Sequence, residues 1–479
     1  MALKLDRPSL PITVTLSLAS ALAFYFGTGL HPIWWLTWLA PFPILWLVPR
    51  LPLWQAFAAS LLVSFVGWLN FWPYLHRVLG VPSPVVLLTL FLPAVIVALA
   101  VLLFRWLVRR GAPLQAALAF PAFWVCTEFL NATTSVHSTS GNLAYSQMNF
   151  LPVLQIASVT GIWGISFFVL LFSASLAAIL STPADNGRTK LLAAVAILLL
   201  GGTLAFGVWR LHNANPSPTA TVALIASDLP QNELPSEQED ALRLFHDYAA
   251  QVNALSGQHI QSIVIPEKIA VALPGYISEV DSLFSGAAAR TGAVVVVGMV
   301  RRDSNGLWNE ARIYTPDGAP PRTYEKHHML PPFESKFVVG TTREFLTQPS
   351  GLWGVAICKD MDFPRLSREY GLAGTGLLLV PAWDFDADGW LHGRMSFLRG
   401  IEDGFSIARA PRHGILTVTD DRGRVLAERN TNSQPFTVLV AQVPVQHDAT
   451  LYLRWGNWFP WFCLFILLVC VGTAAKSRV

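Results

Sequence analysis

Three polar side chains of types suited to acyl chemistry each stand at the end of an expected strand: Glu267, Lys326 and Cys358. A glutamate can take the proton of a thiol, and the thiolate can attack a carbonyl carbon. A lysine can stabilise the resulting oxyanion, and a nearby ammonium also lowers the pKa of a cysteine. These residues are therefore a sufficient set for nucleophilic acyl chemistry, provided that the fold brings them together.

Each residue also has an ordinary structural explanation. A cysteine such as Cys358 at the end of a strand is commonly a small buried hydrophobic residue. Glu267 can begin a helix, and Lys326 can be a solvated loop charge beside His327 and His328. These adjacent histidines point apart on a strand or loop and lack the spacing of a metal motif, so we expect no metal and no cofactor.

The elements that must position the three residues indicate an α/β domain with layered sheets. Short runs rich in Val, Ile and Leu, without strict polar alternation, are typical of strands covered on both faces. Helical spacing of apolar residues predicts helices over 237–254 and 390–407. The expected strands are 221–226, 262–266, 293–300, 354–358 and 376–381.

The rest of the 479-residue chain is predicted to lie in a membrane. Of all residues, 53% are hydrophobic and 13% are charged, and charged residues are sparse before Trp209. A membrane span needs about 20 apolar helical residues. The first apolar stretch follows two basic residues like a signal peptide, but the spans after it favour a retained helix. The expected spans are 11–29, 32–49, 53–73, 84–108, 113–131, 157–181, 190–209 and 456–474.

Basic residues in the short connections predict the orientation, because cytoplasmic loops carry an excess of Lys and Arg. Both termini are then cytoplasmic, and the polar domain, inserted before the last span, lies outside. The side opposite the cytoplasm has only Arg77 and Arg210 near the membrane. The cytoplasmic side holds Lys4, Arg7, Arg50, Arg105, Arg109, Arg110, Arg188, Lys190, Lys476 and Arg478.

Charge and cysteine usage exclude other classes. The net charge is +3, and no basic run alternates with aromatic residues, so we expect no nucleic-acid partner. Cys126, Cys463 and Cys470 lie in apolar stretches, which leaves Cys358 alone in the polar region. A disulfide framework or a thiolate zinc site in that region would need grouped cysteines.

Three segments, 265–267, 324–334 and 357–360, resemble the signature blocks of the carbon-nitrogen hydrolase (nitrilase) superfamily, in the order Glu, Lys, Cys. The surrounding apolar spans, with Glu128, 141–147 and 155–164, resemble one branch, the apolipoprotein N-acyltransferases. This resemblance implies a polytopic α-helical membrane domain of about eight spans and an α/β nitrilase-like α-β-β-α sandwich. The implied domains are a seven-helix membrane domain over 1–212, a catalytic domain over 218–450 and a membrane helix over 451–479.

The resemblance also implies roles for single residues. Glu267 would be the general base, Lys326 the oxyanion-stabilising cation and Cys358 the nucleophile that becomes a thioester. Glu334 matches a second glutamate that supports the site, and Asp360 stands where the family has a supporting acidic residue. Phe333 and Trp383 are expected to line the substrate pocket. The block 390–421, with His392, Arg399, Glu402, Gly404, Arg409 and Gly414, resembles the scaffold after the nucleophile.

Several positions depart from the family pattern. Lys359 replaces the usual aromatic residue, Asp360 replaces a glutamate, and Pro381–Asp384 replaces an Asn-Ser-Asp type run. The first strand ends in Ala226–Asp228 where a Gln-Gly-Asn run is expected. The three reactive residue types are intact, whereas the pocket wall differs.

The expected function is a two-step acyl transfer in the cell inner membrane, with the catalytic domain on the periplasmic side and the chain acting as a monomer. Cys358 would take an acyl chain from a phospholipid and pass it to the amine of a diacylglyceryl lipoprotein. One alternative is a membrane-tethered amidase in which water resolves the thioester. The other is a catalytically silent homologue that binds lipid or lipoprotein.

Overall fold

The chain folds into two compact units in a computed structural model that describes residues 5–183, 187–213, 216–230 and 233–476. The first unit comprises Met1–Asn213 and Trp455–Val479, and the second comprises Ala214–Arg454. The second unit is thus inserted in the sequence of the first, ahead of its last helix.

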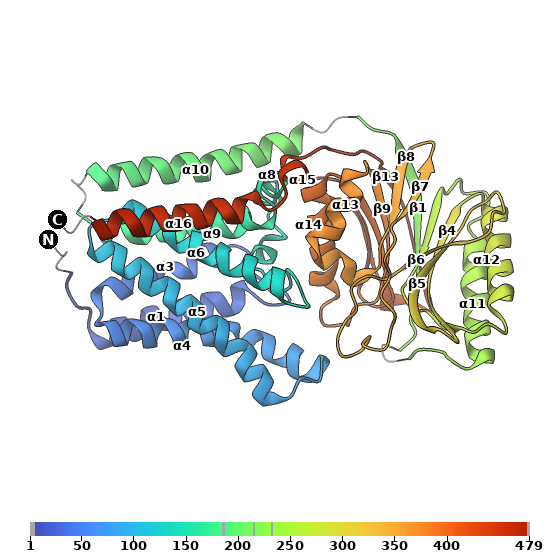
Figure 1. Cartoon of the computed structure of the whole chain (residues 1–479), viewed down its shortest axis with the longest axis horizontal. Coiled ribbons are helices and arrows are strands. Elements are labelled where there is room, and N and C mark those ends of the chain that lie inside the picture. The colour runs from blue at the N-terminus through green and yellow to red at the C-terminus, as the bar shows by residue number, and fades with distance from the viewer. Residues whose placement is uncertain (1–4, 184–186, 214–215, 231–232, 477–479) are drawn as a thin grey trace. The chain divides into compact units, whose positions relative to one another are not determined.

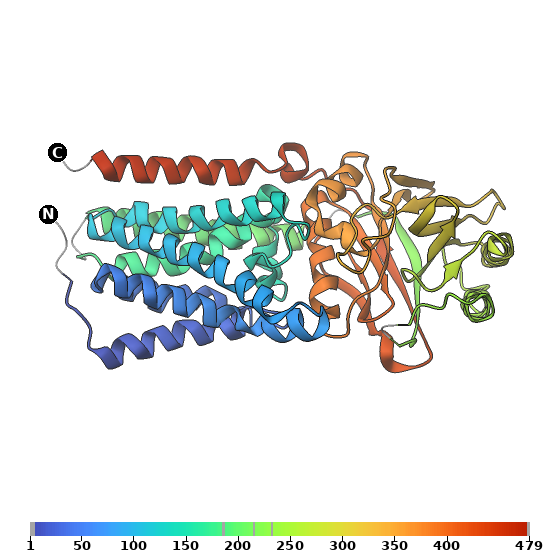
Figure 2. The same ribbon diagram turned by 60° about the horizontal axis from the view of Figure 1, so that its bottom comes forward.

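The first unit is helical, and seven of its described helices are long and apolar enough to cross a membrane. They run side by side in Figures 1 and 2. Many of their large apolar side chains are exposed, as lipid-facing residues would be. The long helices are α1 (Leu10–Gly27), α4 (Leu53–Trp68, extended by a 3-10 turn to Phe71), α5 (Ser83–Arg109), α6 (Pro113–Thr134), α9 (Ile162–Ile179), α10 (Gly187–His212) and α16 (Trp458–Lys476). The short helices are α2 (Leu36–Leu39), α3 (Pro41–Leu47), α7 (Leu151–Leu154), α8 (Ala157–Thr160) and α15 (Leu451–Trp455), which overlaps the unit boundary.

The second expected span, 32–49, is shorter than predicted. It consists of α2 and α3, separated at Ala40, and Pro41 occupies the first turn of α3, where a proline is tolerated. The segment is too short to be counted with the seven long helices. Figures 1 and 2 nevertheless place the start of α1 and the end of α16 at the same end of this unit, which requires an even number of crossings. The short segment of α2 and α3, added to the seven long helices, gives this even number.

Basic residues at one end of this unit donate hydrogen bonds to the ends of neighbouring helices. Arg110 Nη1 donates to the carbonyl of Ala474 (2.6 Å), and Arg188 Nη1 donates to the carbonyl of Gly111 (3.0 Å). Arg50 reaches the end of α9, where its Nη1 donates to Ser181 Oγ. These belong to the residues expected on the cytoplasmic side; Lys4 and Arg478 of that set lie outside the described residues.

The second unit contains two sheets. The larger has the strand order β13-β1-β2-β4-β5-β6, with β3 beside β4, and the other has the order β12-β11-β10-β9-β8-β7. The strands of the larger sheet are β1 (Thr219–Ser227), β2 (Ser262–Ile265), β3 (Val271–Ala272), β4 (Val294–Asp303), β5 (Gly306–Tyr314), β6 (Arg322–Glu325) and β13 (Phe436–Pro444). Those of the smaller are β7 (Glu344–Gln348), β8 (Gly351–Val355), β9 (Leu377–Ala382), β10 (Ser406–Pro411), β11 (Ile415–Thr419) and β12 (Val425–Asn430).

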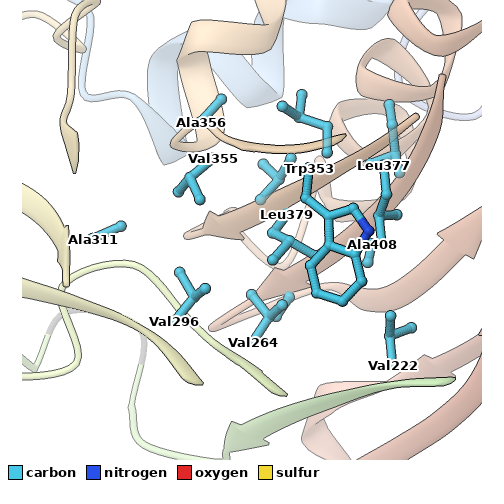
Figure 3. Packing of buried hydrophobic residues seen from close by; sticks show 14 of the residues in the cluster. Val222, Val264, Val296, Ala311, Trp353, Val355, Ala356, Leu377, Leu379 and Ala408 are labelled. Carbon is cyan, nitrogen blue, oxygen red and sulfur yellow. The ribbon is translucent and has the colours of Figure 1, made fainter. Parts of the chain in front are cut away.

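The core of this unit lies between the two sheets. Side chains of both, among them Val222 and Val264 from one and Trp353 and Leu379 from the other, form one buried cluster (Figure 3). A second cluster packs α11 (Gln238–Asn253) and α12 (Ile277–Thr291) on the larger sheet. Helices α13 (Pro364–Leu372) and α14 (Gly389–Asp403) contact elements of the smaller sheet and its loops. The result is the expected α-β-β-α sandwich (Figure 1).

The predicted elements of this unit are confirmed with two corrections: the strand expected over 354–358 ends at Val355, ahead of the turn that carries Cys358, and the second expected helix is shorter. The five expected strands correspond to β1, β2, β4, β8 and β9, and the expected helix at 237–254 is α11. The helix expected over 390–407 ends at Asp403, because Gly404 takes a left-handed conformation (φ +76°) and closes it. Ser406 already belongs to β10. Apolar spacing alone did not reveal this change from helix to strand.

Candidate active site

Cys358 lies in a sharp turn after β8, at the start of the 3-10 helix η5 (Cys358–Asp362). Its φ of +42° is in the left-handed region, which costs a non-glycine residue on the order of 1 kcal/mol or more. The side chain is buried, and Sγ lies 3.5 Å from the carbonyl oxygen of Trp383, to which it donates. Backbone strain of this kind is common where a reactive side chain must be held in one direction.

Lys326 and Glu267 are in direct contact, although 59 positions separate them in the sequence. Glu267 follows β2 and Lys326 follows β6, and both side chains are buried. Lys326 Nζ donates to Glu267 Oε1 and to Glu334 Oε2, each at 2.8 Å. An ammonium has three donors, so one remains for a further acceptor.

Glu334 gathers four donors. Besides Lys326, its carboxylate accepts from Lys268 Nζ, from Asn309 Nδ2 (2.8 Å) and from the backbone N–H of Leu330 (2.8 Å). Asn309 lies in β5 and also donates to Glu267 Oε1 (2.5 Å). A single amide thus joins the two glutamates, although the sequence interpretation did not include it.

Asp360 connects the loop that follows Lys326 to the turn that carries the cysteine. Its Oδ1 accepts from the backbone N–H groups of His327 (3.1 Å) and His328 (2.9 Å). Its Oδ2 accepts from Tyr324 Oη (2.7 Å) and from the backbone N–H of Ile357 (3.2 Å). This buried aspartate is therefore placed to hold the lysine loop and the cysteine turn in one geometry.

The two residues expected to line a pocket differ in exposure. Phe333 is 52% exposed, and its ring centroid lies 5.7 Å from that of Phe385. Trp383 is partly buried, and its ring contacts two cations, with Lys268 Nζ 4.9 Å and Arg412 Cζ 4.3 Å from its centroid. These contacts fix the segment whose carbonyl meets Cys358.

Electrostatics distinguish the three residues. Burial and the charge of Glu267 raise the pKa of the Cys358 thiol to about 12, against the opposing effects of His392 and Lys326. Burial lowers the pKa of Lys326, but Glu267 and Glu334 outweigh it and leave that pKa well above its usual value. Burial raises the pKa of Glu334, but the charges of Lys326 and Lys268 have the larger, opposite effect and leave that pKa below its usual value. The lysine is therefore charged, and the thiol needs a base.

Two further residues lie beside the cysteine. A carboxylate oxygen of Asp384, a ring nitrogen of His392 and Sγ of Cys358 all lie within 4.8 Å of one another. This spacing would admit a metal ion, but Arg409 donates to both oxygens of Asp384 (2.5 and 2.6 Å). The ring nitrogens of His392 face Asp384 and Asp362. The arrangement is therefore an ion-pair network, and block 390–421 contributes to the site more directly than the expected scaffold role.

Comparisons with known proteins match both units. Residues 16–175 match the apolipoprotein N-acyltransferase N-terminal domain, and residues 247–448 match the carbon-nitrogen hydrolase family. The chain is 27% identical to the apolipoprotein N-acyltransferase of Geobacter metallireducens over 414 residues, which cover 78% of this chain and 77% of that relative. It is 26% identical to that of Haemophilus ducreyi over 518 residues, covering 99% of each. A solved amidase from Nesterenkonia sp. is 22% identical, covers 50% of this chain and 94% of its own, and superposes with a TM-score of 0.41.

Proposed function

Because the chain belongs to the apolipoprotein N-acyltransferase family, we propose that it transfers a fatty acyl chain from a membrane phospholipid to the N-terminal amine of S-diacylglyceryl-cysteine lipoproteins. The observation that carries the mechanism is the contact of Lys326 with Glu267 and Glu334 beside Cys358. The reaction we assign runs through a thioester on Cys358.

In the first step, Glu267 takes the proton of the Cys358 thiol. Both hydrogen bonds described above reach its Oε1, so we assign proton uptake to Oε2. The thiolate then attacks the ester carbonyl of the phospholipid and forms a C–S bond, while the oxyanion accepts the third donor of Lys326. The C–O bond breaks, Glu267 returns the proton to the leaving lyso-lipid oxygen, and the acyl thioester remains.

In the second step, the amine of the lipoprotein attacks the thioester carbonyl. Glu267 takes a proton from the attacking nitrogen, and Lys326 again stabilises the oxyanion. The C–S bond breaks, the amide forms and Cys358 recovers the proton from Glu267. The roles of Glu334 and Asp360 in this scheme are to position Lys326 and the cysteine turn through the contacts described above.

Membrane spans suit this pair of substrates, because a phospholipid donor and a lipid-anchored acceptor both arrive through the bilayer. The long apolar helices make the chain a membrane protein. We further propose the cell inner membrane, with Arg110 and Arg188 at the cytoplasmic end of the helices and residues 218–450 as a catalytic domain on the periplasmic side. We propose that it acts as a monomer.

The test is a mass spectrum of the full-length protein in detergent micelles after incubation with phospholipid. The expected result is an acyl adduct on the peptide containing Cys358, with little free fatty acid. A diacylglyceryl-cysteine peptide with a free amine should then discharge the adduct and become N-acylated. The N-acetylated peptide should not, because its nitrogen lone pair is delocalised into the amide.

Two outcomes of that experiment would contradict the proposal. Continuous fatty-acid release at a rate unaffected by the peptide would identify a hydrolase in which water resolves the thioester. If the protein forms no adduct under any condition, although thermal unfolding shows that it is folded, it is a catalytically silent homologue.

A further inference from the structure

His392, in the first turns of α14, lies beside the sulfur of Cys358. A ring nitrogen of His392 is within 4.8 Å of Cys358 Sγ. Its Nδ1 lies 3.0 Å from Asp384 Oδ1, and its Nε2 lies 3.5 Å from Asp362 Oδ1. Both nitrogens therefore lie within ion-pair distance of a carboxylate, and this favours the form in which both carry a proton.

The charged groups that face His392 come from two elements besides its own. Asp362 and the thiol of Cys358 belong to η5, and Asp384 follows β9. Asp362 and Asp384 are both buried, and His392 is 18% exposed on its side chain. Little solvent is available to screen the interaction of the imidazole with the sulfur.

Each carboxylate also has a cationic partner of its own. Lys359 Nζ lies 3.4 Å from Asp362 Oδ2, and Arg409 donates two hydrogen bonds to Asp384. With His392 protonated, the network has three cations and two carboxylates, and so one net positive charge. With His392 neutral, the network has no net charge. The protonation of His392 therefore decides whether this network beside the sulfur carries a net positive charge.

The directions of the pKa shifts agree with this geometry. Burial lowers the pKa of His392, but Asp362 and Asp384 outweigh it and leave the pKa well above its usual value. His392 in turn lowers the pKa of Cys358, as Lys326 does. The thiol thus has a cation on α14 in addition to the one that follows β6.

We infer that His392 is a further positively charged residue of the active site, which stabilises the Cys358 thiolate and the anionic intermediates formed at that sulfur. It remains protonated throughout and transfers no proton, since Glu267 carries that role. The inference rests on the proposed function for the reaction it assists, whereas its effect on the thiol is independent of any lipid substrate.

The experiment measures the rate at which iodoacetamide alkylates Cys358 in the full chain between pH 6 and pH 10, below the thiol pKa of about 12, where the rate is proportional to the small thiolate fraction and rises with pH. Mass spectrometry of the peptide that contains Cys358 excludes signal from the other cysteines. An opposite charge at this distance moves a pKa by about one to three units, and the flanking carboxylates favour the low end of that range. In His392→Gln the profile should therefore move about one unit to higher pH, with alkylation at neutral pH roughly tenfold slower.

Two companion variants separate charge from structure. His392→Lys keeps a cation between the two carboxylates, so its profile should stay within about half a unit of the wild type. A residue that serves only packing would lose its role in both variants. His246→Gln, at an exposed position of α11, should leave the profile unchanged. Thermal unfolding of each variant shows whether the fold is retained.

A His392→Gln profile that superimposes on the wild type would overturn the inference. Should that variant fail to fold, the lysine variant decides: a profile like the wild type supports a role for the charge, and a displaced one refutes it. The two proposals can fail separately. If His392→Gln slows alkylation of Cys358 but the wild-type protein forms no acyl adduct with phospholipid, the proposed function is contradicted and the inference is supported.

Discussion

Replacing Glu334 with glutamine removes the anion that two lysines share, and keeps nearly the same shape. Lys326 and Lys268 both donate to this carboxylate, which is buried. Glutamine can still accept from the Leu330 N–H, but it offers no charge to either lysine. The substitution therefore isolates the electrostatic contribution of Glu334 to the site.

The magnitude follows from the burial of the pair. Breaking a buried ion pair by removing one partner costs about 3–5 kcal/mol, because it leaves a charge uncompensated. Lys326 keeps Glu267 at 2.8 Å and Lys268 is 13% exposed, so the lower end, about 3 kcal/mol, applies. For a domain of this size, that loss lowers the unfolding temperature by roughly 6–12 °C.

The effect depends on pH with a definite sign. The pKa of Glu334 is lowered in the folded protein, so its stabilisation is present above the unfolded-state pKa of about 4.3 and is lost as pH falls further. The difference in unfolding temperature between wild type and Glu334→Gln should thus be largest near neutral pH. It should shrink progressively below about pH 4.

The assay is thermal unfolding of the full chain in detergent, followed by tryptophan fluorescence, with acyl-adduct formation measured on the same samples. Because Lys326 loses one of its two anchors, adduct formation should slow on the order of 10- to 100-fold. Glu369→Gln is the matched control: its pair with Arg343 is 41% exposed on the glutamate side, and such surface pairs contribute about 0–1 kcal/mol. If Glu334→Gln unfolded within the control's range and formed adduct at the wild-type rate, the reasoning would be refuted.

Four further predictions concern the reaction and the topology. Cys358→Ser should fold but form no adduct, whereas Cys126→Ser should keep activity. Full peptide N-acylation by the Cys358→Ser variant would exclude the thioester. Glu267→Gln should slow adduct formation and recover partly as pH rises, because thiolate then forms without a base and the loss of the Glu267 charge removes one cause of the raised thiol pKa. Lys326→Met should lose about 10²–10³ in rate at every pH, and equal recovery of both variants would mean that Lys326 acts mainly on the thiol. Reporter fusions after Leu211 and at Val479 should report opposite sides of the membrane; the same side for both would exclude the orientation proposed from the basic residues.

The sequence by itself was sufficient for features that depend on local pattern. Apolar runs of about 20 residues identify long membrane helices, because lipid requires continuous hydrogen-bonded helix with apolar side chains. Buried strands appear as runs of Val, Ile and Leu, and the strand before Glu267 was expected to end within one residue of its observed end, whereas the strand expected to reach Cys358 ends at Val355. The positions of Glu267, Lys326, Glu334 and Cys358 within the signature blocks were likewise readable without a structure.

Only the tertiary structure decided which side chains meet. Asn309 joins Glu267 and Glu334 because β5 pairs with both β4 and β6, and no local pattern in Gly306–Tyr314 marks that residue. His392 reaches Cys358 because α14 follows β9 back over the turn at η5, so a residue read as scaffold faces the sulfur. Contacts of this kind arise from strand order and helix placement, which join positions far apart in the sequence, and the physical state of each ionisable group depends on those partners.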